Sequence, residues 1–490
     1  MSVWRPPPHA MEHYFGHTWL VRLLFTRGLG ALYFVAFLSS LNQFPALLGE
    51  RGLLPARDFL QRVPFGVAPS LFHWRYSDRL LKLVSWIGIV ISLLIIAGVV
   101  ERAPWWAGIA IWLIPWALYM SIVNVGQTFY SFGWESMLLE TGFFAAFLGP
   151  RNLAPPVIVL AILRWMLFRV EFGAGLIKLR HDECWRNLTC LYYHYETQPL
   201  PNPLSWYFHR FPKWFQRQSV VFSHFAQVIV PWGLFAPQPV ASIAGALLIL
   251  HQLLLIISGN YSWLNWLTVV LGVTALDFGR SPLPLLPRPM AFETIIYLLL
   301  ALTAVLSIRP AINLFSRSQA MNYCWNRFHL VCAYGAFGSI TKQRYEIVLE
   351  GSDDGQEWKE YGFRAKPGDP MRTPPQVAPY HLRLDWLMWF LPFSVMVGQG
   401  RIVVPGYEVW FIRFVHKLLE GDAQALKLLR RNPFTGHPPK MIRATYYLYQ
   451  FTNWKEKRET HAWWKRTRVD DYLPPVTLEA LNAAMASLRE

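Results

Sequence analysis

Long apolar runs with few charges fill the first three-fifths of the chain. Each run has about 20 residues, the length that an α-helix needs to cross about 30 Å of hydrocarbon. The clearest runs are 80–100, 104–123, 239–258 and 291–308. Less clear runs are 28–48, 155–178, 219–236, 261–277 and 128–149, of which the last carries Glu135 and Glu140. The pattern predicts a polytopic α-helical membrane protein with about nine transmembrane helices.

The pattern changes near residue 309, where short segments between turn residues replace the long runs. The segments RFHLVCAYGAFGSI, RYEIVLEGS, WKEYGF and KMIRATYYLYQFT have the β-branched and aromatic content of strands. Residues 407–422 have the periodicity of an amphipathic helix that buries Trp410, Phe411, Phe414 and Leu418. We therefore expect two domains. They are a transmembrane domain at 1–308 with an interfacial loop at 179–218, and a mixed, mainly antiparallel β domain carrying helices at 309–490.

Composition agrees with this division. Of the 490 residues, 53% are hydrophobic and 16% are charged, whereas soluble domains have about 25% charged residues. The C-terminal part, 309–490, holds 25 Lys/Arg and 17 Asp/Glu, against 21 and 13 in the longer part before it. These values exclude a disordered chain and make a single soluble enzyme improbable.

The net charge of +16 changes the expected partners. Basic proteins often bind nucleic acid, but no nucleic-acid motif accompanies the charge in this sequence. A basic surface against anionic lipid headgroups accounts for it more simply. We expect membrane lipid as a partner and no nucleic acid.

The charges also predict an orientation. Nine spans put the two termini on opposite sides, and an N-terminus in the cytoplasm satisfies the positive-inside rule at most short loops. The inside loops then carry Arg102, Arg151, Arg280 and Arg288. The loop 49–79, which has five arginines, is the exception. The loop 179–218 and the C-terminal domain would face the periplasm in a bacterial inner membrane, or the lumen in an endoplasmic reticulum membrane.

All four cysteines lie in segments expected on this outer side, where disulfides form. Four cysteines allow three pairings. We expect Cys184 and Cys190 to form a local disulfide, and the sequence leaves Cys324 and Cys332 open.

Charged side chains inside the run 155–178 are candidates for function, because charges in a membrane are costly. Arg164, Glu171 and Lys178 are spaced by seven residues and share one stripe of the helix. One interpretation is a structural seam of ion pairs, in which Glu135 and Glu140 could also pair with Arg164 or Arg169. The other is a polar cavity that opens outward, with Lys178 as a base or substrate anchor.

The segment after this run is dense in polar and aromatic residues. It offers Arg186, His194 and Glu196 as binding candidates, but its spacing matches no zinc pattern, and we expect no metal. No nucleotide-binding or nucleophile motif occurs, so we expect no cofactor either.

Three segments resemble the lipase maturation factor family: CWRNLTCLYYHYETQPLPNPLSWYFH at 184–209, RFHLVCAYGAFGSITKQRYEIVLEG at 327–351 and PYHLRLDWLMWF at 379–390. The resemblance implies a polytopic membrane protein that helps immature secreted lipases fold and assemble. It also implies that the C-terminal domain faces the lumen. More distantly, GAGLIKL at 173–179 is similar to the segment of the vitamin K-dependent gamma-carboxylase family that carries its catalytic lysine, which corresponds here to Lys178.

Two functions follow from these observations. The favoured one is a folding factor without enzymatic activity, whose client is an immature lipase bound by Trp386, Trp389 and Trp410, unless those side chains belong to the domain core. The alternative is an intramembrane enzyme for a lipid- or quinone-like substrate, with Lys178 as base and Glu171, Arg164 and Arg186 as positioning groups. The apolar segment 383–397, too short to span, is expected to pack on the sheet or lie among headgroups.

Overall fold

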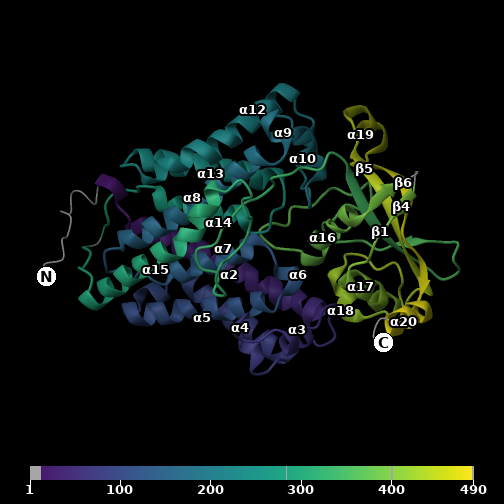
Figure 1. Ribbon diagram of the computed structural model, residues 1–490, viewed down its shortest axis with the longest axis horizontal. Coiled ribbons are helices and arrows are strands. Elements are labelled where there is room, and N and C mark those ends of the chain that lie inside the picture. The colour runs from purple at the N-terminus through teal and green to yellow at the C-terminus, as the bar shows by residue number, and fades with distance from the viewer. Residues whose placement is uncertain (1–12, 283, 399–400, 488–490) are drawn as a thin grey trace.

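The computed structural model describes residues 13–282, 284–398 and 401–487. A body of long helices forms one end and the middle of the molecule, and a twisted sheet forms the other end (Figure 1). Five helices are long and apolar enough to cross a membrane: α2 (Trp19–Leu48), α4 (Asp78–Ile96), α5 (Trp105–Asn124), α13 (Val240–Ser258) and α15 (Met290–Phe315). The chain is therefore a polytopic membrane protein.

The other four expected spans do not meet both criteria, so a count of nine is not confirmed. The run 155–178 forms α8 (Val157–Arg180), which is long enough but highly charged. The other three form short or broken helices. These are α6 (Gln127–Tyr130) with α7 (Gly133–Ala145), α12 (Lys213–His224) followed by the π-helical turn η3 (Phe225–Ile229) and the 3₁₀ helix η4 (Val230–Phe235), and α14 (Leu264–Gly272) with η5 (Val273–Ala275).

The expected interfacial loop folds into short helices that pack against the C-terminal domain. They are α9 (Glu183–Arg186), α10 (Leu191–Thr197) and α11 (Ser205–His209). Trp206 is fully buried and donates its ring N–H to the Thr452 carbonyl at 2.8 Å. Arg344 donates to the carbonyls of Glu196 and Pro199 at 3.0 and 3.1 Å. The loop and the C-terminal domain thus share one end of the molecule.

The sheet confirms the expected antiparallel β architecture. Its strand order is β2-β1-β5-β6, and every pair is antiparallel. The strands are β1 (Arg344–Ser352), β2 (Lys359–Glu360), β5 (Met441–Phe451) and β6 (Trp464–Thr477), and β3 (Met396–Gly398) pairs separately with β4 (Arg401–Val403). The helices are α16 (Arg383–Met388), α17 (Val409–Leu419), α18 (Ala423–Leu428), α19 (Trp454–Thr460) and α20 (Leu478–Ser487).

Two local expectations have opposite outcomes. The amphipathic helix is confirmed as α17, which buries Trp410, Phe411, Phe414 and Leu418. The strand expected at 327–340 is wrong, because that segment is irregular and Phe337 and Val331 have positive φ angles of 54° and 50°. L-residues rarely adopt this conformation, so a regular strand cannot continue through it.

The expectation for 383–397 holds in part: the first turns, α16, dock on the helical body and not on the sheet, whereas the 3₁₀ helix η6 (Leu391–Ser394) packs on strand β1. Arg383 is fully buried, and its guanidinium donates to a Glu135 carboxylate oxygen at 2.7 Å and to the Phe129 carbonyl at 2.8 Å. The same guanidinium lies 3.4 Å from the ring centre of Tyr130. A buried charge is tolerated only with such partners, and these partners fix where α16 docks.

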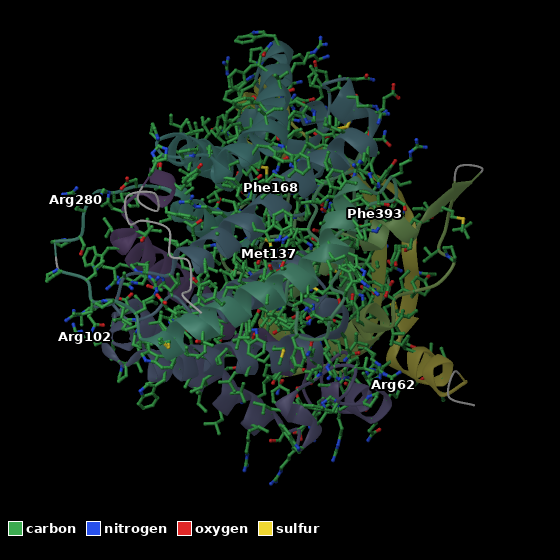
Figure 2. All side chains as sticks on the ribbon, turned by 60° about the vertical axis from the view of Figure 1, so that its left-hand side comes forward. Arg62, Arg102, Met137, Phe168, Arg280 and Phe393 are labelled. Carbon is green, nitrogen blue, oxygen red and sulfur yellow. A yellow bond between two sulfur atoms is a disulfide. The ribbon has the colours of Figure 1, made fainter. Side chains whose placement is uncertain are left out.

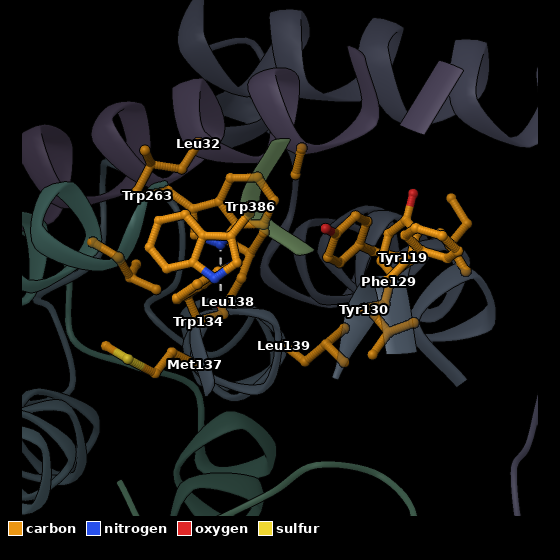
Figure 3. Packing of buried hydrophobic residues seen from close by; sticks show 14 of the residues in the cluster. Leu32, Tyr119, Phe129, Tyr130, Trp134, Met137, Leu138, Leu139, Trp263 and Trp386 are labelled. Atoms are coloured by element: carbon orange, nitrogen blue, oxygen red, sulfur yellow. Dashed lines mark hydrogen bonds between the residues drawn. The ribbon is translucent and has the colours of Figure 1, made fainter. Parts of the chain in front are cut away.

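Figure 3 shows a cluster of indole rings, and the Arg383 guanidinium lies 5.8 Å from the ring centre of one of them, Trp263. Trp386 of α16 lies edge-on to Trp134 of α7, with ring centres 5.0 Å apart. Trp263 donates its N–H to the Trp134 carbonyl at 3.0 Å. The two expected domains therefore share one core, and α15 continues to Phe315, beyond the boundary expected at 308. Where the domains divide stays a prediction.

The second carboxylate of α7 holds another part of the C-terminal half. Glu140 pairs with Arg169, as one of the expected pairings had it. Glu140 also accepts hydrogen bonds from the Cys332 N–H at 2.8 Å and the Tyr334 hydroxyl at 2.7 Å. Arg169 also donates to the Cys332 carbonyl, so both backbone groups of Cys332 are bonded to side chains and cannot join a strand ladder.

Separating Glu135 from Arg383 should destabilise the whole chain. We expect Arg383→Met or Glu135→Gln to lower the free energy of unfolding by about 3–5 kcal/mol, because each leaves a buried partner unpaired. The Arg383→Met, Glu135→Gln double variant should recover much of that loss. Thermal unfolding in detergent measures all three, and a double variant as unstable as the sum of the singles would contradict a coupled pair.

Acid should also destabilise the protein. Burial lowers the pKa of His194 to about 3, and those of His209, His329 and His381 to about 4 each. The unfolded chain binds protons at these sites near pH 6.5 while the folded chain does not, so the free energy of unfolding should fall as the pH drops from about 6.5 toward 4. An unfolding temperature that stays constant between those values would contradict this.

Candidate functional site

A cavity of about 390 Å³ lies where α8, α12, α13 and α14 meet the interfacial loop. Glu171 and Lys178, two turns apart on α8, both face it. Gln227, from the π-helical turn η3, and Gln252, from α13, face it from the opposite side. A π-helical turn often marks a functional position, and this one places Gln227 between the two charged groups.

Hydrogen bonds connect these side chains into one chain of contacts. The Lys178 ammonium donates to the Gln227 amide oxygen at 2.5 Å, and the Gln227 amide nitrogen donates to Glu171 at 3.1 Å. The second Glu171 oxygen accepts from Gln252 at 2.6 Å, and Gln252 in turn accepts from Asn265 at 2.6 Å. Lys178 and Glu171 are therefore linked through an amide, and they form neither the direct ion pair of a seam nor a free base.

The interfacial loop covers the Lys178 end of this series of hydrogen bonds. The Lys178 ammonium lies 4.9 Å from the ring centre of Trp185, a cation–π contact. Cys184 and Cys190 are bonded as expected, with Cα atoms 4.8 Å apart, and they hold Trp185 over Lys178. His194 is paired with the Tyr261 hydroxyl at 2.8 Å. The loop thus closes the cavity at one end.

The second disulfide joins Cys324 to Cys332, with Cα atoms 4.4 Å apart. It fixes the irregular segment whose Tyr334 and Phe337 also line the cavity. Asp182 lies near the sulfurs of the first disulfide. Its carboxylate accepts the backbone N–H groups of Cys184 and Ile340 at 2.9 and 3.0 Å, which gives it a structural role.

Three sequence-predicted candidates lie away from the cavity. Arg164, at the other end of α8, donates to the carbonyls of Thr274 and Leu234 at 3.0 and 3.3 Å. Arg186 is exposed and donates to the Leu179 carbonyl at 3.2 Å. Glu196 accepts from the Phe451 N–H at 2.7 Å. The cavity brings together Glu171, Lys178 and His194, and the stripe with Arg164 is not one site.

The tryptophans expected to bind a client have different environments. Trp386 and Trp410 are 4% and 3% exposed, so they belong to the core, the alternative recognised for them above. Trp389 is half-buried and donates to the Thr197 carbonyl at 2.9 Å. Phe390 and Phe393 are 42% and 50% exposed, and both rings contact Trp389. We call Trp389, Phe390 and Phe393 the aromatic ledge; Figure 2 shows Phe393 beside the sheet.

The residues of the cavity that sequence reasoning missed are uncharged. Gln227, Gln252 and Asn265 form the hydrogen bonds that run from Lys178 and Glu171, and Tyr261 bonds His194 and Gln198, yet none of the four has a charge to single it out. The available signal was an amide side chain inside an apolar run, which is costly unless it has a partner. The partner of Glu135 was also missed, because Arg383 lies 248 positions away.

Comparisons with known proteins cover both halves of the chain. The family model for the lipase maturation factor transmembrane domain matches residues 20–280, and that for the lipase maturation factor C-terminal domain matches residues 330–474. No solved structure matches.

Named relatives are similar along nearly their whole length. Lipase maturation factor 1 of Mus musculus is 41% identical, covering 95% of this chain and 89% of the relative. Lipase maturation factor 1 of Homo sapiens is 39% identical, covering 98% and 92%. Lipase maturation factor 2 of Homo sapiens is 29% identical, covering 94% and 83%. Because two family models match in order and these relatives cover nearly the whole chain, the chain belongs to the lipase maturation factor family.

Proposed function

We propose that this chain is a membrane-anchored maturation factor that helps an immature secreted lipase to fold and assemble on the extracytoplasmic side. The observation that carries the proposal is the 41% identity to mouse lipase maturation factor 1 over 95% of the chain. The similarity includes the helical body as well as the C-terminal domain. The joint core of the two parts supports a role in which they act as one unit.

The client contact that we propose is the aromatic ledge. Its exposed rings, together with Met396, which is 60% exposed, form an apolar surface on the C-terminal half. Exposed apolar patches on a folded protein typically bind partners. An immature lipase exposes apolar surface of its own, so contact with the ledge would cover both surfaces.

The topology that we propose has about nine crossings, a cytoplasmic N-terminus, and the interfacial loop and C-terminal domain outside. The disulfides Cys184–Cys190, in the interfacial loop, and Cys324–Cys332 support this orientation. Disulfides form in the endoplasmic reticulum lumen and in the periplasm. Arg102 and Arg280 lie at the end opposite Phe393, as the positive-inside rule requires (Figure 2). Arg62 belongs to the loop 49–79, which departs from the rule, and it lies nearer the end of the molecule that holds the sheet.

The enzyme alternative is not favoured. The relatives described above are maturation factors. Lys178 donates to an amide, and both oxygens of Glu171 accept from amides, so neither group is placed as a free acid or base. The positioning groups Arg164 and Arg186 are engaged elsewhere with backbone carbonyls.

Polar substitution of the ledge should impair lipase maturation without unfolding the protein. In cells whose own maturation factor has been deleted, we expect Phe390→Ser, Phe393→Ser to lower secreted lipase activity, while the amount of the factor stays the same. The matched control is Val403→Ser, Val409→Ser, because these side chains are also apolar and are 56% and 58% exposed. Equal activity from the ledge variant and the control would contradict a client contact at the ledge.

Glycosylation in a mammalian cell should report which end faces the lumen. We expect Asp354→Asn with Gln356→Ser, which creates an acceptor in an exposed turn, to gain a glycan that endoglycosidase removes. Phe278→Asn with Arg280→Thr creates the same motif at the opposite end and should gain none. A glycan on the second variant and not the first would reverse the proposed orientation.

A further inference from the structure

The cavity beside Lys178 reaches the surface of the helical body. Phe215 and Phe222 of α12 and Leu254 of α13 form part of its apolar wall. Phe215 and Leu254 are 40% and 39% exposed, so the opening lies between these two helices. In Figure 1, α12 and α13 lie along one side of the helical body.

The surface around this opening is apolar. Helix α13 is one of the five candidate spans, and its Leu250, Leu253 and Ile257 are 48%, 42% and 42% exposed. A spanning helix with such a face contacts lipid tails. A molecule that enters between α12 and α13 therefore arrives from the bilayer, and its apolar part matches Phe215, Phe222 and Leu254.

Two buried polar atoms of the cavity have no partner among the described residues. Among the described residues, no group bonds the His251 Nδ1 or the Asn265 Oδ1, although the two residues are only 3% and 4% exposed. Both residues line the cavity. The Lys178 ammonium has three N–H donors, of which one is directed to Gln227. Buried polar groups nearly always have a partner, so these positions are built to receive hydrogen-bonding groups of a ligand.

Charge balance selects the kind of head group. Lys178 and Glu171 already compensate each other through Gln227. A charged head would add an uncompensated charge to a buried site, which is costly. An uncharged head with a carbonyl and hydroxyl groups can bond all three residues. The carbonyl accepts from Lys178, one hydroxyl donates to the Asn265 Oδ1, and another donates to the His251 Nδ1 or accepts from it.

We propose that this cavity binds one uncharged, single-chain glycerolipid of the monoacylglycerol kind, whose head contacts Lys178, His251 and Asn265 and whose acyl chain leaves between α12 and α13. The site is built from the helical body, the interfacial loop and the segment 322–337, and its lining includes none of the three ledge residues. It is a function additional to the handling of a client.

The test is photolabelling of the whole chain in nanodiscs with a 1-monoacylglycerol that carries a diazirine in its acyl chain and a terminal alkyne. We expect labelled peptides from 215–227 and 251–265. Leu254→Trp fills the opening and should lower labelling roughly tenfold. Leu250→Trp, one turn away on the same exposed face and outside the cavity wall, should leave labelling within about twofold of the unmodified chain. Equal labelling of the two variants, or labelled peptides spread over all spanning helices, would overturn the site.

Competition then tests the head group. Unlabelled monoacylglycerol should displace the probe, whereas the fatty acid of the same chain length, which is anionic, should displace it far less. Stronger displacement by the fatty acid would overturn the uncharged head, and equal displacement by a plain hydrocarbon would overturn any role for Lys178, His251 and Asn265. Because the readout is labelling and not lipase output, these outcomes are separate from the outcome for the client role.

Discussion

The buried ion pair between Glu135 and Arg383 is the contact on which the rest of the structure depends. Both side chains are fully buried; the Tyr119 hydroxyl donates to Glu135 and accepts from the Arg383 guanidinium, and the Gln43 amide oxygen accepts the backbone N–H of Arg383. Neither charge could remain in this environment alone. Because one partner belongs to a helix of the membrane part and the other follows the first strand of the sheet, the pair determines how the two parts dock. The indole rings of Trp134, Trp263 and Trp386 pack together once the ion pair has fixed where α16 docks.

The same short helix, α7, also positions the candidate site. Through Glu140 it holds Cys332 and Tyr334, and the segment that follows them contributes Phe337 to the cavity wall. The cavity is therefore made by both halves of the chain. A helix of 13 residues, too short to be an unambiguous span, thus holds two C-terminal segments: Glu135 bonds Arg383 of α16, and Glu140 bonds Cys332 and Tyr334.

Sequence periodicity predicted the elements that are defined by the local spacing of their own apolar residues. Strand β1 begins and ends where RYEIVLEGS does, and the apolar stripe of α17 is buried as its spacing required. The function was predicted from the resemblance to the lipase maturation factor family, and not from periodicity. What periodicity could not predict depends on distant partners. Arg169 and Glu140 override strand formation near Cys332, and Gln227 acquires its role only when a π-helical turn places it between Lys178 and Glu171. Such contacts are selected by tertiary packing, which leaves no local repeat.

The distance of 248 positions between Glu135 and Arg383 has a consequence for biogenesis. At about 5–20 residues per second, the ribosome needs roughly 10–50 s to supply the cation after the carboxylate has been made. During that interval α7 carries a carboxylate whose native partner does not yet exist, so the membrane part cannot close its core. Completion of this protein is thus delayed until late in translation. A maturation factor that needs its last third to finish its membrane core would itself spend its early life as an incomplete, quality-control-sensitive intermediate.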